Sequence, residues 1–169
     1  TPGVPAHDHA DAASGGATLS PDALSVGADP TERPVISTGD RRVHVPEDYD
    51  TIQAAVNTIP LFVRHGLTIE IAPGTYDEDV VVPAFVSTEP VTMDRDGGYV
   101  NVAGDEGNPT SVQVGSMYVA GPTGRLPLAI LGMTFLRQNP YDDEKTALAF
   151  YGGGEHYVRN VVIGQGSFS

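Results

Sequence analysis

Residue types that often anchor small domains are missing or nearly missing from this chain. It has no cysteine, no tryptophan and a single lysine, Lys145, in 169 residues. Without cysteine the protein has no disulfide, no thiolate nucleophile and no thiolate metal site. It also lacks any run of the roughly 20 apolar residues that a membrane-spanning helix needs, so we expect no membrane insertion.

The charge is strongly one-sided. The chain carries 22 acidic against 9 basic residues, a formal net charge of −13 at pH 7. Such a surface repels nucleic acid phosphates, so we expect no nucleic-acid partner. An excess of Asp over Glu with almost no lysine indicates adaptation to multimolar salt, in which screening removes the self-repulsion of the acidic surface. The sequence therefore predicts a halophilic source and favours an archaeal host.

Residues 1–40 consist mainly of Ala, Gly, Ser, Pro, Asp and Thr, with few large apolar side chains before Val35. Such a segment cannot bury enough apolar surface to fold alone, which predicts an extended leader. Its His7-Asp8-His9, Gly15-Gly16 and Leu19-Ser20-Pro21-Asp22-Ala23-Leu24 motifs resemble leaders of tail-fibre and spike proteins of tailed viruses. The resemblance implies attachment to other virion proteins through residues 1–40, and His7 and His9 are the candidate metal ligands if three chains bring them together on an axis.

The best-patterned segment runs from Arg42 to Pro83. Asp50 is the predicted N-cap of a helix from about Thr51 to Val63, and Ile52, Ala55, Val56 and Ile59 make one apolar face of it. Alternating apolar residues at 67–71 then predict a strand, the Pro-Gly-Thr-Tyr sequence at 73–76 a turn, and the valines at 80–82 a second strand.

This order resembles the entry to right-handed parallel β-helix proteins of the pectin-esterase and pectate-lyase-like superfamily. The matching residues are 49–56, 69–76 and 77–83. The resemblance implies that the helix caps the N-terminal end of a solenoid and that Ile52, Val56 and Ile59 face its first coil. It implies no particular activity, because enzymes, virus spikes and surface proteins share this fold.

Beyond residue 84 the chain is a series of short apolar segments separated by Gly-rich turns, and no second helix is predicted. Segments beginning near residues 67, 99, 128 and 157 recur at spacings of roughly 28 to 33, the range expected of solenoid coils. We therefore predict an all-β fold, a short parallel β-helix over 41–169 with an N-terminal capping helix and an extended leader over 1–40. The expected strands are 91–93, 99–102, 112–114, 117–119, 128–131, 133–136, 147–151 and 157–163.

No complete catalytic motif is present. A carboxylate pair for sugar chemistry could come from Asp94 and Asp96 or from residues 142–144, but close carboxylates are also expected by chance on so acidic a surface. The superfamily's esterase branch carries a Gly-x-Val-Asp-Phe-Ile-Phe-Gly strand and a Leu-Gly-Arg-Pro-Trp turn, and neither occurs here. Its lyase branch uses a basic residue near calcium; Arg125 and Arg137 are the candidates here, but no accompanying Asp pattern supports them. His44, His65 and His156 lack metal-ligand spacing.

Two classes of function remain open. The first is a virion structural protein of a halophilic virus, such as a spike, tail fibre or capsid-surface module, without cofactor or catalysis, forming a homo-oligomer with a trimer favoured. The second is a secreted or cell-surface carbohydrate-active β-helix protein of a haloarchaeon. In the first case we expect contacts with a host surface glycan or glycoprotein through exposed turns. The candidate contact residues are Asp94, Asp96, Tyr141, Asp142, Asp143 and Glu144.

Overall fold

The computed structural model describes residues 33–87, 98–120, 124–138, 146–151 and 154–164, and strands predominate among them. The coarse prediction of a mainly-β protein is therefore confirmed. The elements in chain order are β1 (Arg41–Val45), α1 (Ile52–Val56), β2 (Phe62–Val63), β3 (Leu67–Ile71), β4 (Gly74–Pro83), β5 (Val86–Ser87), β6 (Val100–Ala103), the short 3-10 helix η2 (Pro109–Ser111), β7 (Val112–Ala120), β8 (Gly124–Phe135), β9 (Leu148–Tyr151) and β10 (Gly154–Ile163).

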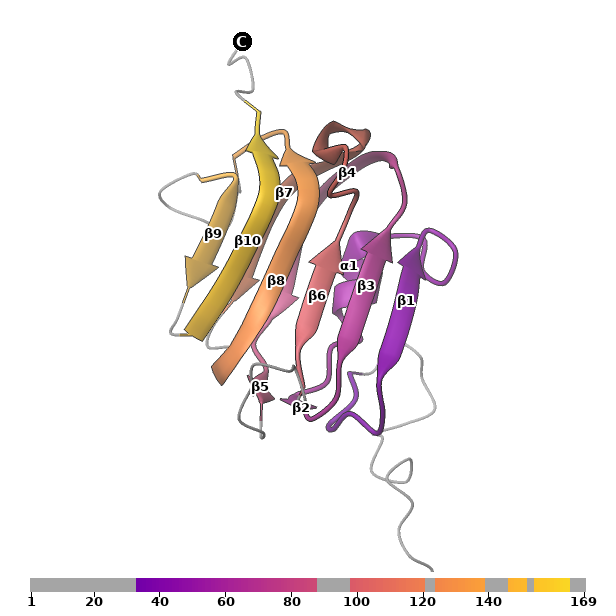
Figure 1. Ribbon diagram of the computed structural model, residues 1–169, viewed down its shortest axis with the longest axis vertical. Helices are drawn as coiled ribbons and strands as arrows, with labels where there is room; N and C mark the ends of the chain where they lie inside the picture. Colours follow the sequence, from indigo (N-terminus) through magenta and orange to yellow (C-terminus); the bar gives the residue numbers. More distant parts are fainter. Residues whose placement is uncertain (1–32, 88–97, 121–123, 139–145, 152–153, 165–169) are drawn as a thin grey trace, which may run out of the picture.

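The strands pair in parallel along rows. In the first row β1, β3, β6, β8 and β10 lie side by side, as Figure 1 shows. In a second row, the start of β4 pairs with the start of β7, which pairs with the end of β8, which pairs with the end of β10. In a third row, the end of β4 pairs with the end of β7, which pairs with β9. A small pair, β2 with β5, lies beside these rows. All the pairings between described strands are parallel, which requires the chain to return to the same side before each new strand.

Two long strands, β8 and β10, pass from the first row to the second at a residue with left-handed backbone. In β8 this residue is Gly132, with φ of 60°, and a Cβ there would lie 2.4 Å from the amide nitrogen of Glu106. In β10 the corresponding residue is Asn160, with φ of 53°, a conformation that Asn tolerates better than most residues. These corners let one continuous strand pair with β6 in the first row and with β7 in the second.

The core is formed by alternate side chains of the strands. Strand β3 has Leu67, Ile69 and Ile71 buried and Thr68 and Glu70 partly exposed, the period of two expected for a sheet with one face inward. In the first row Leu67 aligns with Val100 and Leu128, and Ile69 aligns with Val102 and Ile130. Apolar residues thus stack on like residues, and each fully buried Val, Leu or Ile contributes about 1.5–3 kcal/mol relative to an exposed position.

The N-terminal helix is shorter than predicted. It covers only Ile52–Val56, and its N-cap is Thr51 rather than Asp50, because the Thr51 side chain accepts a hydrogen bond from Ala54 N at 3.0 Å. The chain leaves the helix at Asn57 and reaches Pro60, whose preceding residue is disfavoured in helical geometry. The predicted burial is confirmed: Ile52, Val56 and Ile59 are each 0% exposed and belong to the core.

Several strand boundaries also differ from the prediction. The segments expected at 112–114 and 117–119 form the single strand β7, and those at 128–131 and 133–136 lie in the single strand β8, apart from residue 136. The prediction left gaps at residues 115–116 and at residue 132, whereas the strands continue through them. Helix η2 was not predicted. The expected strand at 91–93 lies outside the described residues.

Candidate functional site

Most of the residues selected from the sequence cannot be placed. His7, His9, Asp94, Asp96 and residues 141–144 lie outside the described residues. The pairing of carboxylates and the trimeric histidine site therefore stay predictions. What the structure does describe is a pair of contrasting ends of the strand rows, and one charged cluster between them.

At the N-terminal end, the last residues of the predicted leader form part of the folded protein. Residues 34–37 run parallel to β2: Leu61 N donates to Pro34 O at 2.9 Å, Phe62 N to Val35 O at 2.8 Å, and Ser37 N to Phe62 O at 3.0 Å. The segment thus adds a further extended strand beside β2 and β5.

Arg33 fastens this segment to the chain. Its Nε donates to Ile59 O at 2.7 Å, and one terminal nitrogen donates to Pro60 O at 3.2 Å and to Ala84 O. Burial lowers the pKa of the guanidinium, but three carbonyl oxygens replace part of its hydration. The side chain therefore ties together three backbone segments at the point where residues 1–32 join.

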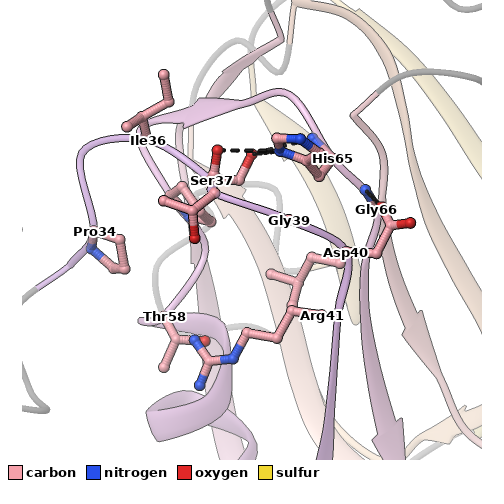
Figure 2. Close-up of a pocket in the computed structure, with 12 residues that line it drawn as sticks. Pro34, Ile36, Ser37, Gly39, Asp40, Arg41, Thr58, His65 and Gly66 are labelled. Carbon is pink, nitrogen blue, oxygen red and sulfur yellow. Dashed lines mark hydrogen bonds between the residues drawn. The ribbon is translucent and has the colours of Figure 1, made fainter. Parts of the chain in front are cut away.

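A pocket of about 260 Å³ lies beside this junction. Figure 2 shows Ser37 and His65 joined by hydrogen bonds there, with Asp40 and Gly66 nearby. Asp40 Oδ1 accepts a hydrogen bond from Gly66 N at 2.7 Å. The lining residues are Pro34, Ile36, Ser37, Thr38, Gly39, Asp40, Arg41, Thr58, Pro60, His65, Gly66 and Leu67.

The serine, histidine and aspartate in this pocket do not have the geometry of a nucleophilic triad. His65 Nδ1 lies 3.1 Å from Ser37 O and 3.2 Å from Ser37 Oγ, so both contacts of the ring with residue 37 use the same nitrogen. In a triad the aspartate would orient the imidazole, whereas Asp40 accepts its hydrogen bond from Gly66 N. Ser37 Oγ also accepts hydrogen bonds from Arg64 N and His65 N, at 2.7 and 3.1 Å. These hydrogen bonds hold residue 37 against residues 64 and 65.

The end of the rows next to this pocket is closed by other side chains. The carboxylate of Glu78 in β4 accepts Ile52 N at 3.0 Å and Gln53 N at 2.9 Å, so it caps the helix from another element. The amide of Gln53 bonds the backbone of Val81 in both directions, at 3.0 and 2.7 Å, as a neighbouring strand would. At β1, Asp48 Oδ2 accepts His44 N at 2.8 Å. Backbone groups of one residue on each strand, His44 of β1 and Val81 of β4, are thus hydrogen-bonded by side chains.

A charged cluster connects β4, β7 and the segment after β8. Asp79 Oδ1 accepts Arg137 Nε at 2.9 Å and Ser116 Oγ at 2.6 Å, and Arg137 also pairs with Asp77. The carboxylates are therefore engaged by a cation and a hydroxyl. Arg137, which the sequence raised for lyase chemistry, serves here as a cross-link. Arg125 lies in β8, and its side chain is outside the described part of the structure.

The opposite end of the rows exposes apolar side chains. Tyr151 of β9 is 71% exposed, and Ile163 of β10 is 61% exposed. Tyr157, Val158 and Val162 of β10 are also exposed large apolar residues. Here His156 stacks on Phe150 with ring centroids 4.4 Å apart, and burial lowers the pKa of its imidazole. We call the exposed side chains of β9 and β10 the end face.

Comparison with protein-family models, curated proteins and solved structures finds no match for this chain. Within the described residues, no group of three or more His, Cys, Asp or Glu side chains is arranged to hold a metal ion. Over the same residues, no helix is both long and apolar enough to cross a membrane.

Arg33 and Glu78 organise these contacts and were not selected from the sequence, and Arg137 was selected for a catalytic role instead of a cross-link. A detectable signal existed for Arg137, since it lies 58 residues from Asp79, about twice the repeat spacing of 28 to 33. Nothing local distinguishes Glu78 from the other acids, because its helix partner is 25 residues away.

Proposed function

We propose that this chain forms a short right-handed parallel β-helix that serves as a structural and attachment module of a halophilic, archaeal virion, in a spike, tail fibre or capsid surface. The parallel rows support the fold, because residues Leu67, Val100, Leu128 and His156 align across successive strands at spacings close to those of solenoid coils. The motif at 49–56 and 69–83 supports membership of the pectin-esterase and pectate-lyase-like superfamily. The leader motifs support a location on the virion.

The observation that carries the attachment role is the junction at residues 33–37. A merely tethered leader would join the domain through an unbonded linker. Here residues 34–37 pair with β2, and Arg33 bonds three carbonyl groups of the chain. A force applied through residues 1–32 is therefore transmitted to the backbone of β2 and of residues 59, 60 and 84. This is the construction that an assembly anchor needs.

The alternative, a carbohydrate-active protein, has one observation in its favour, the two carboxylates beside Arg137. General acid–base chemistry on a glycoside needs one protonated and one free carboxylate flanking the bond. Asp79 instead accepts hydrogen bonds from Arg137 and Ser116, and Asp77 pairs with the same guanidinium. These contacts favour a structural role, and the virion proposal stands ahead of the enzymatic one.

The test is a deletion of residues 1–32 that keeps Arg33. Because the junction is retained, the truncated protein should melt at the same temperature as the full chain, yet it should no longer join the particle. Mass spectrometry of purified particles measures that incorporation. The proposal is wrong if particles assemble and adsorb normally without residues 1–32. Depolymerisation or de-esterification of an acidic polysaccharide that Asp79→Asn abolishes would support the enzyme instead.

The halophilic origin has a separate test. A net charge of −13 destabilises the compact state at low ionic strength, and a screening length of about 3 Å at 1 M salt removes most of that repulsion. The midpoint of thermal unfolding should therefore rise between ~0.1 M and ~3 M NaCl. Equal midpoints at the two concentrations would remove the argument for a salt-adapted surface.

A further inference from the structure

The pocket beside residues 33–37 holds a cation that no carboxylate binds within the described part of the chain. The guanidinium of Arg41, on β1, donates a hydrogen bond at 2.8 Å to the hydroxyl of Tyr49, a neutral group. Asp48 lies within range of its charge, but the Asp48 carboxylate accepts its hydrogen bonds from His44. A guanidinium carries several N–H donors, so Arg41 can bind an acidic group from outside the chain.

This arginine differs from the others whose contacts are described. Acidic residues outnumber basic ones by 22 to 9, so a cation in this chain has many acids to choose from. The engaged side chains are Arg42 with Glu70, Arg137 with Asp77 and Asp79, Arg159 with Glu106, and Arg33 with three carbonyl oxygens. Arg41 instead lines a pocket, where its charge can select a ligand.

The remaining walls of the pocket determine the size and polarity of that ligand. Pro34, Ile36, Pro60 and Leu67 give the lining an apolar part, and Figure 2 shows Ile36 and Arg41 on different sides of the pocket. The volume of about 260 Å³ lies below the roughly 300–1,000 Å³ of pockets for drug-sized ligands. The pocket therefore suits a small molecule with one charged end and one apolar end.

An acid in the lining restricts the charge of the ligand. Asp40 also lines the pocket, where its Oδ1 accepts the hydrogen bond from Gly66 N. Its negative charge repels a dianion such as phosphate more strongly than a monoanion. A carboxylate carries a single charge, and its two oxygens match the planar fork of a guanidinium.

We propose that the pocket binds a small monocarboxylate with a short apolar tail, the carboxylate on Arg41 and the tail against Pro34, Ile36 and Leu67. This site goes beyond the proposed function, because it requires neither a virion nor catalysis. The same chemistry is present in the leader, in which Asp22 precedes Leu24 by two positions. The experiments therefore separate a free ligand from residues 1–32.

The first experiment is an NMR titration of the full chain with sodium hexanoate at constant ionic strength. The backbone amide signals of residues 38–41 and 66 should shift, with a dissociation constant of about 1 mM. Hexanamide, which lacks the charge, and acetate, which lacks the tail, should each bind at least about 10-fold more weakly.

Two neighbouring arginines provide the variant and its control. Arg41→Gln should weaken hexanoate binding at least about 10-fold, because the charged hydrogen bonds are lost. Arg42→Gln removes the same charge one position further on, but the Arg42 side chain pairs with Glu70 and does not line the pocket. That variant should bind hexanoate as the wild type does.

A second measurement follows the wall of the pocket by hydrogen exchange. The amides of Leu61 and Phe62 donate to Pro34 O and Val35 O, so their local exchange requires residues 34–35 to separate from residues 61–62. A ligand held against Pro34 stabilises the paired form. About 10 mM hexanoate should therefore slow this exchange about tenfold, and no more than about twofold in Arg41→Gln.

The inference is overturned if hexanoate shifts none of the pocket amides, if hexanamide binds as tightly, or if glutamine at 41 and at 42 have equal effects. The full chain carrying Asp22→Asn and Leu24→Ser should bind hexanoate with unchanged affinity, and tighter binding would show that the leader is the occupant instead. None of these results bears on the attachment role, which is tested by the incorporation of Δ1–32 protein into particles. Failure of that role would leave the carboxylate site intact.

Discussion

The two ends of the strand rows solve the same physical problem differently. Every stack of parallel strands ends in unpaired backbone groups and an uncovered apolar interior. At the N-terminal end a five-residue helix covers the interior, while Gln53 and Asp48 bond the strand edges. At the end face the last strands leave Tyr151 and Ile163 exposed. The difference is that residues of the chain itself cover the first end, whereas apolar side chains of β9 and β10 are exposed at the second.

The sharpest test of this contrast is the same substitution at both ends. Ile52→Ala removes a side chain that is 0% exposed, so it should lower the free energy of unfolding by about 2–5 kcal/mol. Ile163→Ala removes one that is 61% exposed and should cost no more than about 0.5 kcal/mol. Denaturant unfolding at low protein concentration, where association contributes least, measures both. Equal losses would mean that the ends are equally packed.

Replacing the carboxylate of Glu78, which caps helix α1, should give the next largest loss of stability. Glu78 accepts hydrogen bonds from Ile52 N and Gln53 N, and a Gln side chain at that position offers only one carbonyl oxygen. Glu78→Gln should therefore cost about 1–3 kcal/mol, the cost of leaving a donor unsatisfied. Glu47→Gln, on the exposed turn after β1, removes the same charge and should change stability little. A similar loss in both variants would show that charge, rather than capping, is responsible.

How far the sequence predicted these ends depends on the range of the interactions. The apolar face of Ile52, Val56 and Ile59 was correctly assigned, because a local period determines which side chains are buried. The helix length was wrong, since the same period is satisfied when the chain turns at Asn57 and brings Ile59 inward without a helix. The caps were missed because Glu78 and Gln53 act across about one coil of chain.

Substitutions in the charged cluster between the two ends should change the free energy of unfolding less. Arg137 is 40% exposed, and its partner Asp77 is 85% exposed, so water and salt screen their attraction. Arg137→Lys keeps the charge but loses the planar fork that bonds Asp77 and Asp79 together. The expected loss is about 0.2–1 kcal/mol in dilute salt. Thermal melts of Arg137→Lys and the wild type should converge in concentrated salt, and a gap that widens with salt would contradict this assignment.

The smallest expected effect is a difference in the pH dependence of stability between the two ends. Burial lowers the pKa of His156 below its ordinary value, so the folded end face favours the neutral imidazole. The unfolded chain takes up the proton first as the pH falls, from about 6.5 downward. Stability contributed by His156 is therefore complete above that pH and is lost progressively down to the lowered folded pKa. The Nδ1 atom of this ring is buried and has no described hydrogen-bond partner to offset the charge.

At the N-terminal end the corresponding group is Asp48. The backbone hydrogen bond from His44 chiefly lowers the pKa of its carboxyl, so the stability that Asp48 contributes is lost only as the pH falls from about 3.9 towards the lowered folded pKa. Between pH 7 and 5, hydrogen exchange corrected for its intrinsic pH dependence should accelerate over residues 148–164 and stay constant over 41–56. His156→Gln should remove the acceleration. If both segments loosen together in that window, the two ends unfold as one unit, and the contrast between a closed and an open end has no consequence for stability.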